Sequence, residues 1–210
     1  MTAPAVATAR TQDRLLAAGA LAGPVFAASA VIQMLTRTGF DITRHPISQL
    51  ATGGLGWIQV LTFVLAGLGG LALAVGIRRT VRDGSGRRVL PVCVGIFGVG
   101  MIAAGVFTMD AENGFPVGTP DRPVAQVSWH GVVHSASAAI AFLALAVAAV
   151  ALTVRCVRRR AVLPAVLNAA VALVLFLPMS PDHMSIQIAV NGLFAFAWTT
   201  VVAISLRRTP

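Results

Sequence analysis

Six apolar runs, each about as long as a bilayer crossing, are the feature that most restricts how this chain can fold. A helix needs about 20 apolar residues to span a hydrocarbon core about 30 Å thick. The runs cover residues 15–35, 57–77, 89–109, 129–154, 161–179 and 186–206. They and their connections use all 210 residues, of which 57% are apolar and 11% are charged. We therefore predict an all-α fold, a polytopic membrane helix bundle of about six transmembrane helices that forms one domain over residues 1–210.

The distribution of basic residues predicts how this bundle is oriented. All sixteen basic residues are arginines, and all but three of them lie in segments 10–14, 78–88, 155–160 and 207–208. Because cytoplasmic loops are enriched in arginine, we place these segments and both termini in the cytoplasm, in a multi-pass protein of the cell membrane. The same pattern accounts for the net charge of +9, so no nucleic-acid partner is expected.

The first thirty residues also have features of a cleaved secretory signal. Arg10 and Arg14 precede an apolar stretch that reaches the small-residue segment 27–30. The apolar run continues to Leu35, so we retain it as the first span. Cleavage would leave five spans in the same orientation.

Polar residues that could carry chemistry are predicted at the outer edges of two spans. His130 and His134 begin the fourth span, and their spacing puts both imidazoles on one helical face, about 6 Å apart along the axis. His183, Gln187 and Asn191 repeat this spacing at the start of the sixth span. Such polar stripes are expected to face protein or water rather than lipid.

The outer connections add further candidates at the same membrane depth. The first connection contains His45 and Ser48, and the third span ends at Asp110. The second outer connection, 110–123, is rich in glycine and proline, which predicts a stiff and structured segment. It is either a lid over an outward-facing cavity or a solvated connector.

Asp110, His130, His134 and His183 form the ligand set of a predicted metal site. Such ligands suit zinc, which lowers the pKa of a bound water to about 7 for attack on an ester or amide. Asp110, His130, His134 and Ser48 are the candidate catalytic residues, with Ser48 stabilising an oxyanion. Without a metal, the same groups could act as general acid and base. The expected partner is a membrane lipid or another amphiphilic small molecule.

Each candidate also has a structural interpretation. The histidines of the fourth span would then bond to backbone groups, and Asp110 would cap a neighbouring helix or pair with Arg44 or Arg122. Ser48 and His183 would belong to turns at helix starts. On this alternative, the chain is a non-enzymatic structural, sensory or accessory membrane protein.

Two further functions fit parts of the sequence. In an isoprenoid cyclase, Asp110 or Glu112 would donate the proton that starts the reaction in an aromatic-lined pocket, which ten phenylalanines and three tryptophans allow. Transport ranks last, because it usually needs charged residues or broken helices near the bilayer midplane. Asn168 is the clearly polar residue at that depth, and we interpret it as a contact between helices.

Several motifs together resemble a known family. They are Arg-His-Pro-Ile-Ser-Gln-Leu at 44–50, Gly-Trp at 56–57, Gly-Val-Phe-Thr-Met-Asp at 105–110, Gly-Phe-Pro-Val-Gly-Thr-Pro at 114–120, His-Gly-Val-Val-His at 130–134 and Asn-Gly-Leu-Phe at 191–194. They resemble a bacterial integral-membrane family catalogued as domain of unknown function 998. The resemblance covers most of the chain and implies a six-helix membrane bundle, without an established activity.

The order of Ser48, Asp110, His130 and His134 is more loosely similar to the membrane hydrolase superfamily that includes alkaline ceramidases. That similarity implies a serine, an aspartate and zinc-binding histidines in one site. This chain departs from the pattern, because it has six predicted spans rather than seven and its histidine pair follows the third span instead of ending the chain.

Overall fold

The computed structural model describes residues 3–208, and the first and last two residues of the predicted domain lie outside it. The described part is helical and contains no strand. Its α-helices are α1 (Ala3–Thr36), α2 (Gly56–Thr80), α3 (Val89–Val106), α4 (Trp129–Arg158), α5 (Val162–Phe176) and α6 (Met184–Arg207). Two short 3₁₀ helices are η1 (Ile47–Ala51) and η2 (Pro181–His183). The predicted all-α fold is confirmed.

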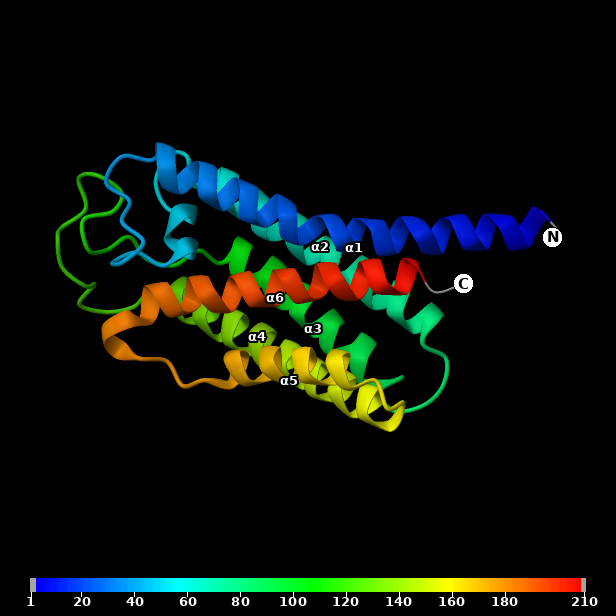
Figure 1. Ribbon diagram of the computed structural model, residues 1–210. Helices are drawn as coiled ribbons and strands as arrows, with labels where there is room; N and C mark the ends of the chain where they lie inside the picture. The colour runs from blue at the N-terminus through cyan, green and yellow to red at the C-terminus, as the bar shows by residue number, and fades with distance from the viewer. Residues whose placement is uncertain (1–2, 209–210) are drawn as a thin grey trace.

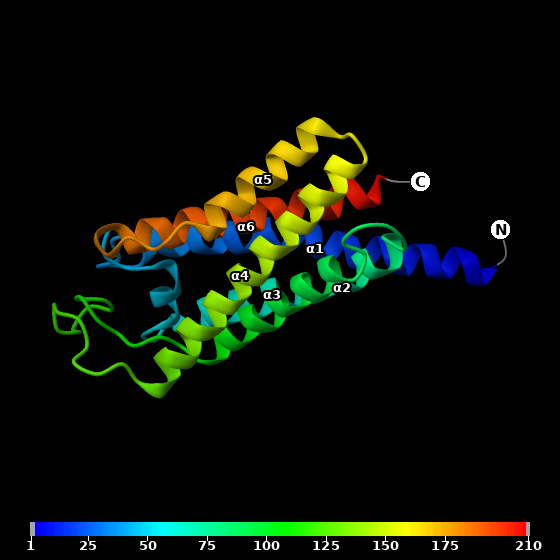
Figure 2. The same ribbon diagram turned by 90° about the horizontal axis from the view of Figure 1, so that it is seen from below.

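Successive helices run antiparallel in one bundle (Figure 1). Each helix from α1 to α4 packs along the next. The last helix, α6, packs along α1, whereas α5 and α6 touch each other much less. Connections 37–55, 107–128 and 177–183 lie at one end of the bundle (Figures 1 and 2). Connections 81–88 and 159–161 lie at the other end, with the start of α1 and the end of α6. The four arginine-rich segments therefore share one end, and we call the opposite end the outer end.

Five of the helices are long and apolar enough to cross a membrane, as expected of a multi-pass membrane protein. The exception is α5, which the sequence predicts over 161–179. It has 15 residues and ends at Phe176, with Leu177 in an extended conformation. At 1.5 Å per residue, 15 residues give about 22 Å, less than a bilayer core. The helix ends here because Pro178 disfavours the helical conformation of the residue before it.

The first helix is longer than its predicted span of 15–35, because the polar residues before residue 15 have partners on other helices. Gln12 Nε2 donates a hydrogen bond of 2.9 Å to Thr80 Oγ1 at the end of α2. The Asp13 carboxylate accepts two hydrogen bonds, of 2.8 and 3.1 Å, from the Arg207 guanidinium of α6. These contacts fasten α1 to both of its neighbours at the arginine-rich end.

The contact between α2 and α3 depends on glycines. A Cβ atom at Gly67 would lie 2.5 Å from the Gly98 carbonyl oxygen, and one at Gly98 would lie 2.7 Å from the Gly67 carbonyl oxygen. Because both distances are shorter than van der Waals contact, the two backbones can approach this closely only without side chains.

The contact between α1 and α6 compensates for a proline inside α1. Pro24 has no N–H to donate to the Ala20 carbonyl, four residues earlier. Thr200 Oγ1 of α6 donates to that carbonyl instead, at 3.2 Å. Gly23 allows this approach, because a Cβ there would lie 2.6 Å from the Phe196 carbonyl oxygen.

Amides inside the bundle bond to other helices. Asn168 of α5 accepts a 2.6 Å hydrogen bond from Trp198 Nε1 of α6, as expected of a contact between helices. Gln33 Nε2 of α1 donates a 2.7 Å hydrogen bond to Gln59 Oε1 of α2. This bond satisfies one atom of each glutamine amide, whereas Gln33 Oε1 and Gln59 Nε2 are buried without a partner among the described residues.

Candidate functional site

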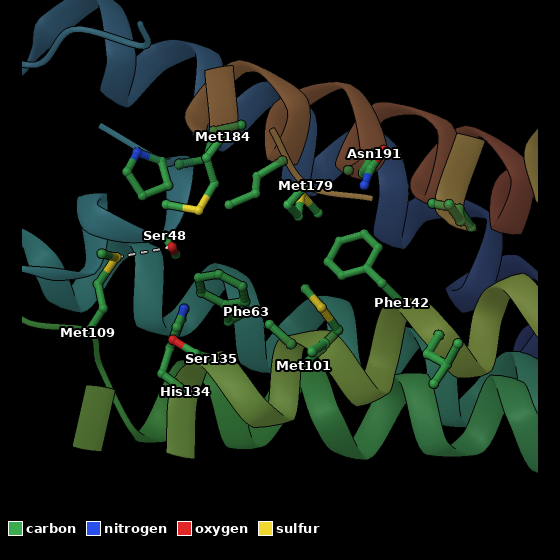
Figure 3. Close-up of a pocket in the computed structure, with 18 of the residues that line it drawn as sticks. Ser48, Phe63, Met101, Met109, His134, Ser135, Phe142, Met179, Met184 and Asn191 are labelled. Atoms are coloured by element: carbon green, nitrogen blue, oxygen red, sulfur yellow. Dashed lines mark hydrogen bonds between the residues drawn. The ribbon is translucent and has the colours of Figure 1, made fainter. Parts of the chain in front are cut away.

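A cavity of about 440 Å³ lies in the outer half of the bundle (Figure 3). It forms where α5 ends early and packs only slightly against α6, and all six helices and η1 contribute to its wall. Its apolar lining is mainly phenylalanine and methionine, namely Phe26, Phe63, Phe142, Phe196, Met101, Met109, Met179 and Met184. Methionine side chains adapt to differently shaped ligands, so this lining suits a flexible hydrocarbon.

His134 of α4 is held in one tautomer at the edge of this cavity. Its side chain is buried, and Nδ1 lies 2.7 Å from the Ala104 carbonyl oxygen and 3.0 Å from that of Phe107. Both are carbonyls at the C-terminal end of α3, where the last turn of a helix lacks intrahelical donors. Since a carbonyl can only accept, Nδ1 carries the proton and the neutral ring has its lone pair on Nε2. No other described residue donates to Nε2.

Asn191 of α6 enters the cavity from across the bundle (Figure 3). Its side chain is only 3% exposed, and its amide makes no hydrogen bond with any other described residue. An amide buried without a partner costs about 1–3 kcal/mol in proteins. Asn191 therefore has donors and an acceptor free for a molecule inside the cavity.

Two hydroxyl groups complete the polar part of the lining. Ser48, in η1, donates a hydrogen bond of 3.2 Å to the sulfur of Met109. A thioether is a weak acceptor, so a better one could displace it. Ser135, next to His134, also lines the cavity, and its hydroxyl has no partner among residues 3–208.

Asp110 does not line the cavity but stabilises the N-terminus of α4. Its Oδ2 accepts a 2.9 Å hydrogen bond from the backbone N–H of Ser128, and Ser128 Oγ accepts one of 3.1 Å from the N–H of Gly131. A carboxylate and a serine hydroxyl are favourable partners for the free N–H groups of a helix start. The predicted capping role of Asp110 therefore matches its geometry. Glu112 Oε2 likewise accepts a hydrogen bond of 3.1 Å, from the Val124 N–H, outside the cavity.

The structure does not gather the four predicted metal ligands. His130 is exposed, with its ring 3.8 Å from the Trp129 ring between centroids, and His183 is exposed in η2. One helical turn separates His130 from His134. The His130 ring packs against Phe107, whereas His134 bonds to the carbonyls of Ala104 and Phe107. Within residues 3–208, no group of three or more His, Cys, Asp or Glu side chains is placed to hold a metal ion. Zinc ligation by Asp110, His130, His134 and His183 has no geometric support here.

The outer loops are joined by two buried side chains. His45 Nδ1 accepts a 2.9 Å hydrogen bond from the Asp41 N–H, and Nε2 donates one of 2.9 Å to the Asn113 carbonyl. Gln49 Nε2 donates to the carbonyls of Glu112 and Phe115, at 2.6 and 3.1 Å. Segment 110–123 is thus fixed above η1, which agrees with the predicted stiff segment.

Sequence reasoning found part of this site and missed the rest. It singled out His134, Asn191 and Ser48, which the structure brings to one cavity. It missed Ser135 and the methionines, because isolated serines and methionines in apolar helices carry no distinguishing pattern. It grouped Asp110 and His130 with the site because the sequence indicates how deep a residue lies in the membrane. The sequence does not indicate in which direction a side chain at the end of a helix points.

A family model described as protein of unknown function (DUF998) matches residues 20–205, which include every residue of the cavity. No curated protein and no solved structure matches the chain.

Proposed function

We propose that this chain, which belongs to the DUF998 family, is a multi-pass protein of the cell membrane that binds an amphiphilic lipid or a similar small molecule in its outer cavity. Positive-inside orientation would place the arginine-rich end and both termini in the cytoplasm, so the cavity faces outward. The hydrocarbon part of the ligand would lie among the phenylalanine and methionine side chains. Its polar group would lie between His134 and Asn191.

One observation carries this proposal: two polar groups without partners are buried in the wall of the same apolar cavity. Nε2 of His134 needs a donor, and the carboxamide of Asn191 offers two donors and an acceptor. A hydroxyl with a neighbouring carbonyl or amide would satisfy both. The volume of about 440 Å³ lies within the range of small-molecule sites.

Hydrolysis of an ester or amide in this cavity is a second candidate function, favoured by the fixed tautomer of His134. Nε2 would take a proton from a water molecule as the water oxygen bonds to the ligand's carbonyl carbon. The resulting oxyanion would accept a hydrogen bond from Ser48 or Asn191. The proton on His134 would then pass to the departing alcohol or amine, leaving a free acid and the original imidazole.

A comparison of two asparagines tests ligand binding against a structural role. Asn191→Leu removes an unpaired buried amide, so the ligand-free protein should be as stable as wild type or more stable, while bound amphiphile is lost. Asn168→Leu is the matched control, because that amide is already paired with Trp198. It should lower stability and leave bound amphiphile in place.

Mass spectrometry of molecules extracted from the purified protein, with thermal unfolding of each delipidated variant, measures both effects. Recovery of the same amphiphiles from wild type and Asn191→Leu would contradict the proposal. For the second candidate, wild type should release acid from long-chain esters or amides, and His134→Asn should not. If wild type binds the amphiphile but does not hydrolyse it, a sensory or accessory role remains for the protein.

A further inference from the structure

A second pocket lies at the arginine-rich end, between α2 and α3 and far from the outer cavity. It has a volume of about 640 Å³. Its lining contains four exposed arginines, Arg78, Arg82, Arg87 and Arg88, and five apolar residues, of which Ala74, Val81 and Pro91 are buried and Val75 and Val92 are exposed. The pocket therefore combines four positive charges with an apolar surface.

The positive charge of this pocket has no counter-charge within the described chain. Asp83 is the one acidic residue between 78 and 88. Its carboxylate lies 3.7 Å from the Arg155 guanidinium and 3.9 Å from that of Arg159, and it does not line the pocket. The guanidinium groups of Arg78 and Arg88 have no hydrogen bond or ion pair with another residue of 3–208.

The connection that carries these arginines is held in place. Arg155, buried in α4, donates hydrogen bonds to the carbonyls of Asp83 and Ser85, at 2.6 and 3.2 Å. Arg82 Nε donates to the Arg79 carbonyl at the end of α2, at 3.1 Å, and Arg87 NH1 donates to the Arg82 carbonyl, at 3.2 Å. These bonds fix the backbone that presents Arg78 and Arg88, so a ligand would meet a largely formed site.

An apolar path leads from the pocket along the lipid-facing side of the bundle. Val92, Ile96 and Val99 follow one face of α3, and all three are exposed. Leu68 and Val75 are exposed on α2. Hydrocarbon attached to a headgroup in the pocket can lie along this surface, which a free phosphate would leave empty.

We propose that this pocket binds the phosphate of an anionic phospholipid from the leaflet at the arginine-rich end, with its acyl chains along α2 and α3. Arg78 and Arg88 are the phosphate ligands, since their guanidinium groups have no other partner. In the orientation proposed above, this is the cytoplasmic leaflet, whose anionic lipids attract basic segments next to membrane spans. The site is independent of ligand binding in the outer cavity.

The test measures lipid affinity of the full chain in neutral detergent, by native mass spectrometry with phosphatidylglycerol and phosphatidylcholine. Arg78→Gln with Arg88→Gln removes the two free guanidinium groups and leaves the bonds of Arg82 and Arg87 intact. Arg10→Gln with Arg14→Gln is the control, because it removes the same charge from the same end, outside the pocket. Thermal unfolding without lipid establishes that both variants are folded.

We expect wild type to prefer phosphatidylglycerol and the pocket variant to bind it about tenfold more weakly or worse, with little change in the control. Equal losses in both variants would overturn the proposal in favour of diffuse charge attraction. Equal affinity of wild type for the two lipids would also overturn it. Displacement of the lipid by millimolar glycerol phosphate would overturn the choice of a lipid over a soluble phosphate ester.

Discussion

Phe26 of α1 and Phe196 of α6 stack with their ring centroids 4.3 Å apart and their planes inclined by 23°. Both rings line the outer cavity, and both also line a groove of about 340 Å³ between α1 and α6. The stacked pair is therefore part of the wall between the cavity and a groove on the α1–α6 side of the bundle, and Ile47 and Gly192 also line both. An amphiphile that enters the cavity from this groove has to displace these rings.

Truncation of this wall should speed ligand exchange. Phe196→Ala is expected to join the cavity to the groove, to raise the dissociation rate of a bound fluorescent amphiphile, and to cost about 3–5 kcal/mol of stability. Phe142→Ala is the control, because Phe142 lines the cavity but not the groove. Stopped-flow fluorescence measures the rates. Equal acceleration in both variants would show that lost contact area, not an opened wall, is responsible.

Glycines in this bundle should differ sharply in their tolerance of alanine. A Cβ at Gly192, on the cavity wall, would meet no atom within 4 Å, so Gly192→Ala should raise stability by about 0.5–1 kcal/mol. Gly98→Ala would place its Cβ 2.7 Å from the Gly67 carbonyl oxygen and should be destabilising by about 1–3 kcal/mol. Thermal unfolding in detergent measures both effects. If Gly192→Ala is destabilised, the space next to Gly192 is not open.

Two substitutions should distinguish the structural role of His134 from its role in ligand binding. Leucine at this position leaves the Ala104 and Phe107 carbonyls without their donor, with an expected loss of about 1–3 kcal/mol. Asparagine can still donate from the position of Nδ1 but offers nothing in place of Nε2. We expect His134→Asn to unfold near the wild-type temperature and yet to retain less amphiphile. If both variants bind ligand as wild type does, Nε2 has no part in binding.

Asp41 should contribute to the acid sensitivity of the outer loops. Its carboxylate accepts hydrogen bonds from the Thr43 hydroxyl and then the Thr43 N–H, and these hold the pKa of Asp41 below its ordinary value. A pKa lowered by folding stabilises the protein above the unfolded-state pKa, and this contribution is lost as the pH falls through the folded-state pKa. Thr43→Val should therefore reduce stability at neutral pH, and its difference from wild type should shrink near pH 3. A constant difference from pH 7 to about pH 3 would exclude this coupling.

The sequence predicted helices better than it predicted their ends. The starts of α3 at Val89 and α4 at Trp129 agree with the predicted spans, because arginines or a polar loop precede them. The predicted fifth span is too long, since apolar composition does not distinguish a helix from the extended residues before Pro178. The predicted first span is too short, because its polar start is stabilised by residues 68 and 194 positions away.

The candidate site was only partly predictable for a related reason. Spacing along α4 and α6 indicated polar stripes at the outer end, and His134 and Asn191 belong to them. Which stripe residues face a shared cavity depends on how α4, α5 and α6 pack, and no local pattern records that packing. His130 shares its stripe with His134 but lies beyond the end of α3. Its ring contacts Phe107 and Trp129, and it does not line the cavity.

The hydrogen bond from Thr200 to the Ala20 carbonyl joins residues 180 positions apart, and it bears on how the protein is made. Helices enter the membrane in the order of their synthesis, so α1 arrives with a carbonyl that its own proline leaves open. The partner of that carbonyl is on the last helix. Until α6 is inserted, this carbonyl lacks its side-chain donor, although α1 can already pack along α2. Completion of the bundle is then a single late event, in which the final helix closes against the first.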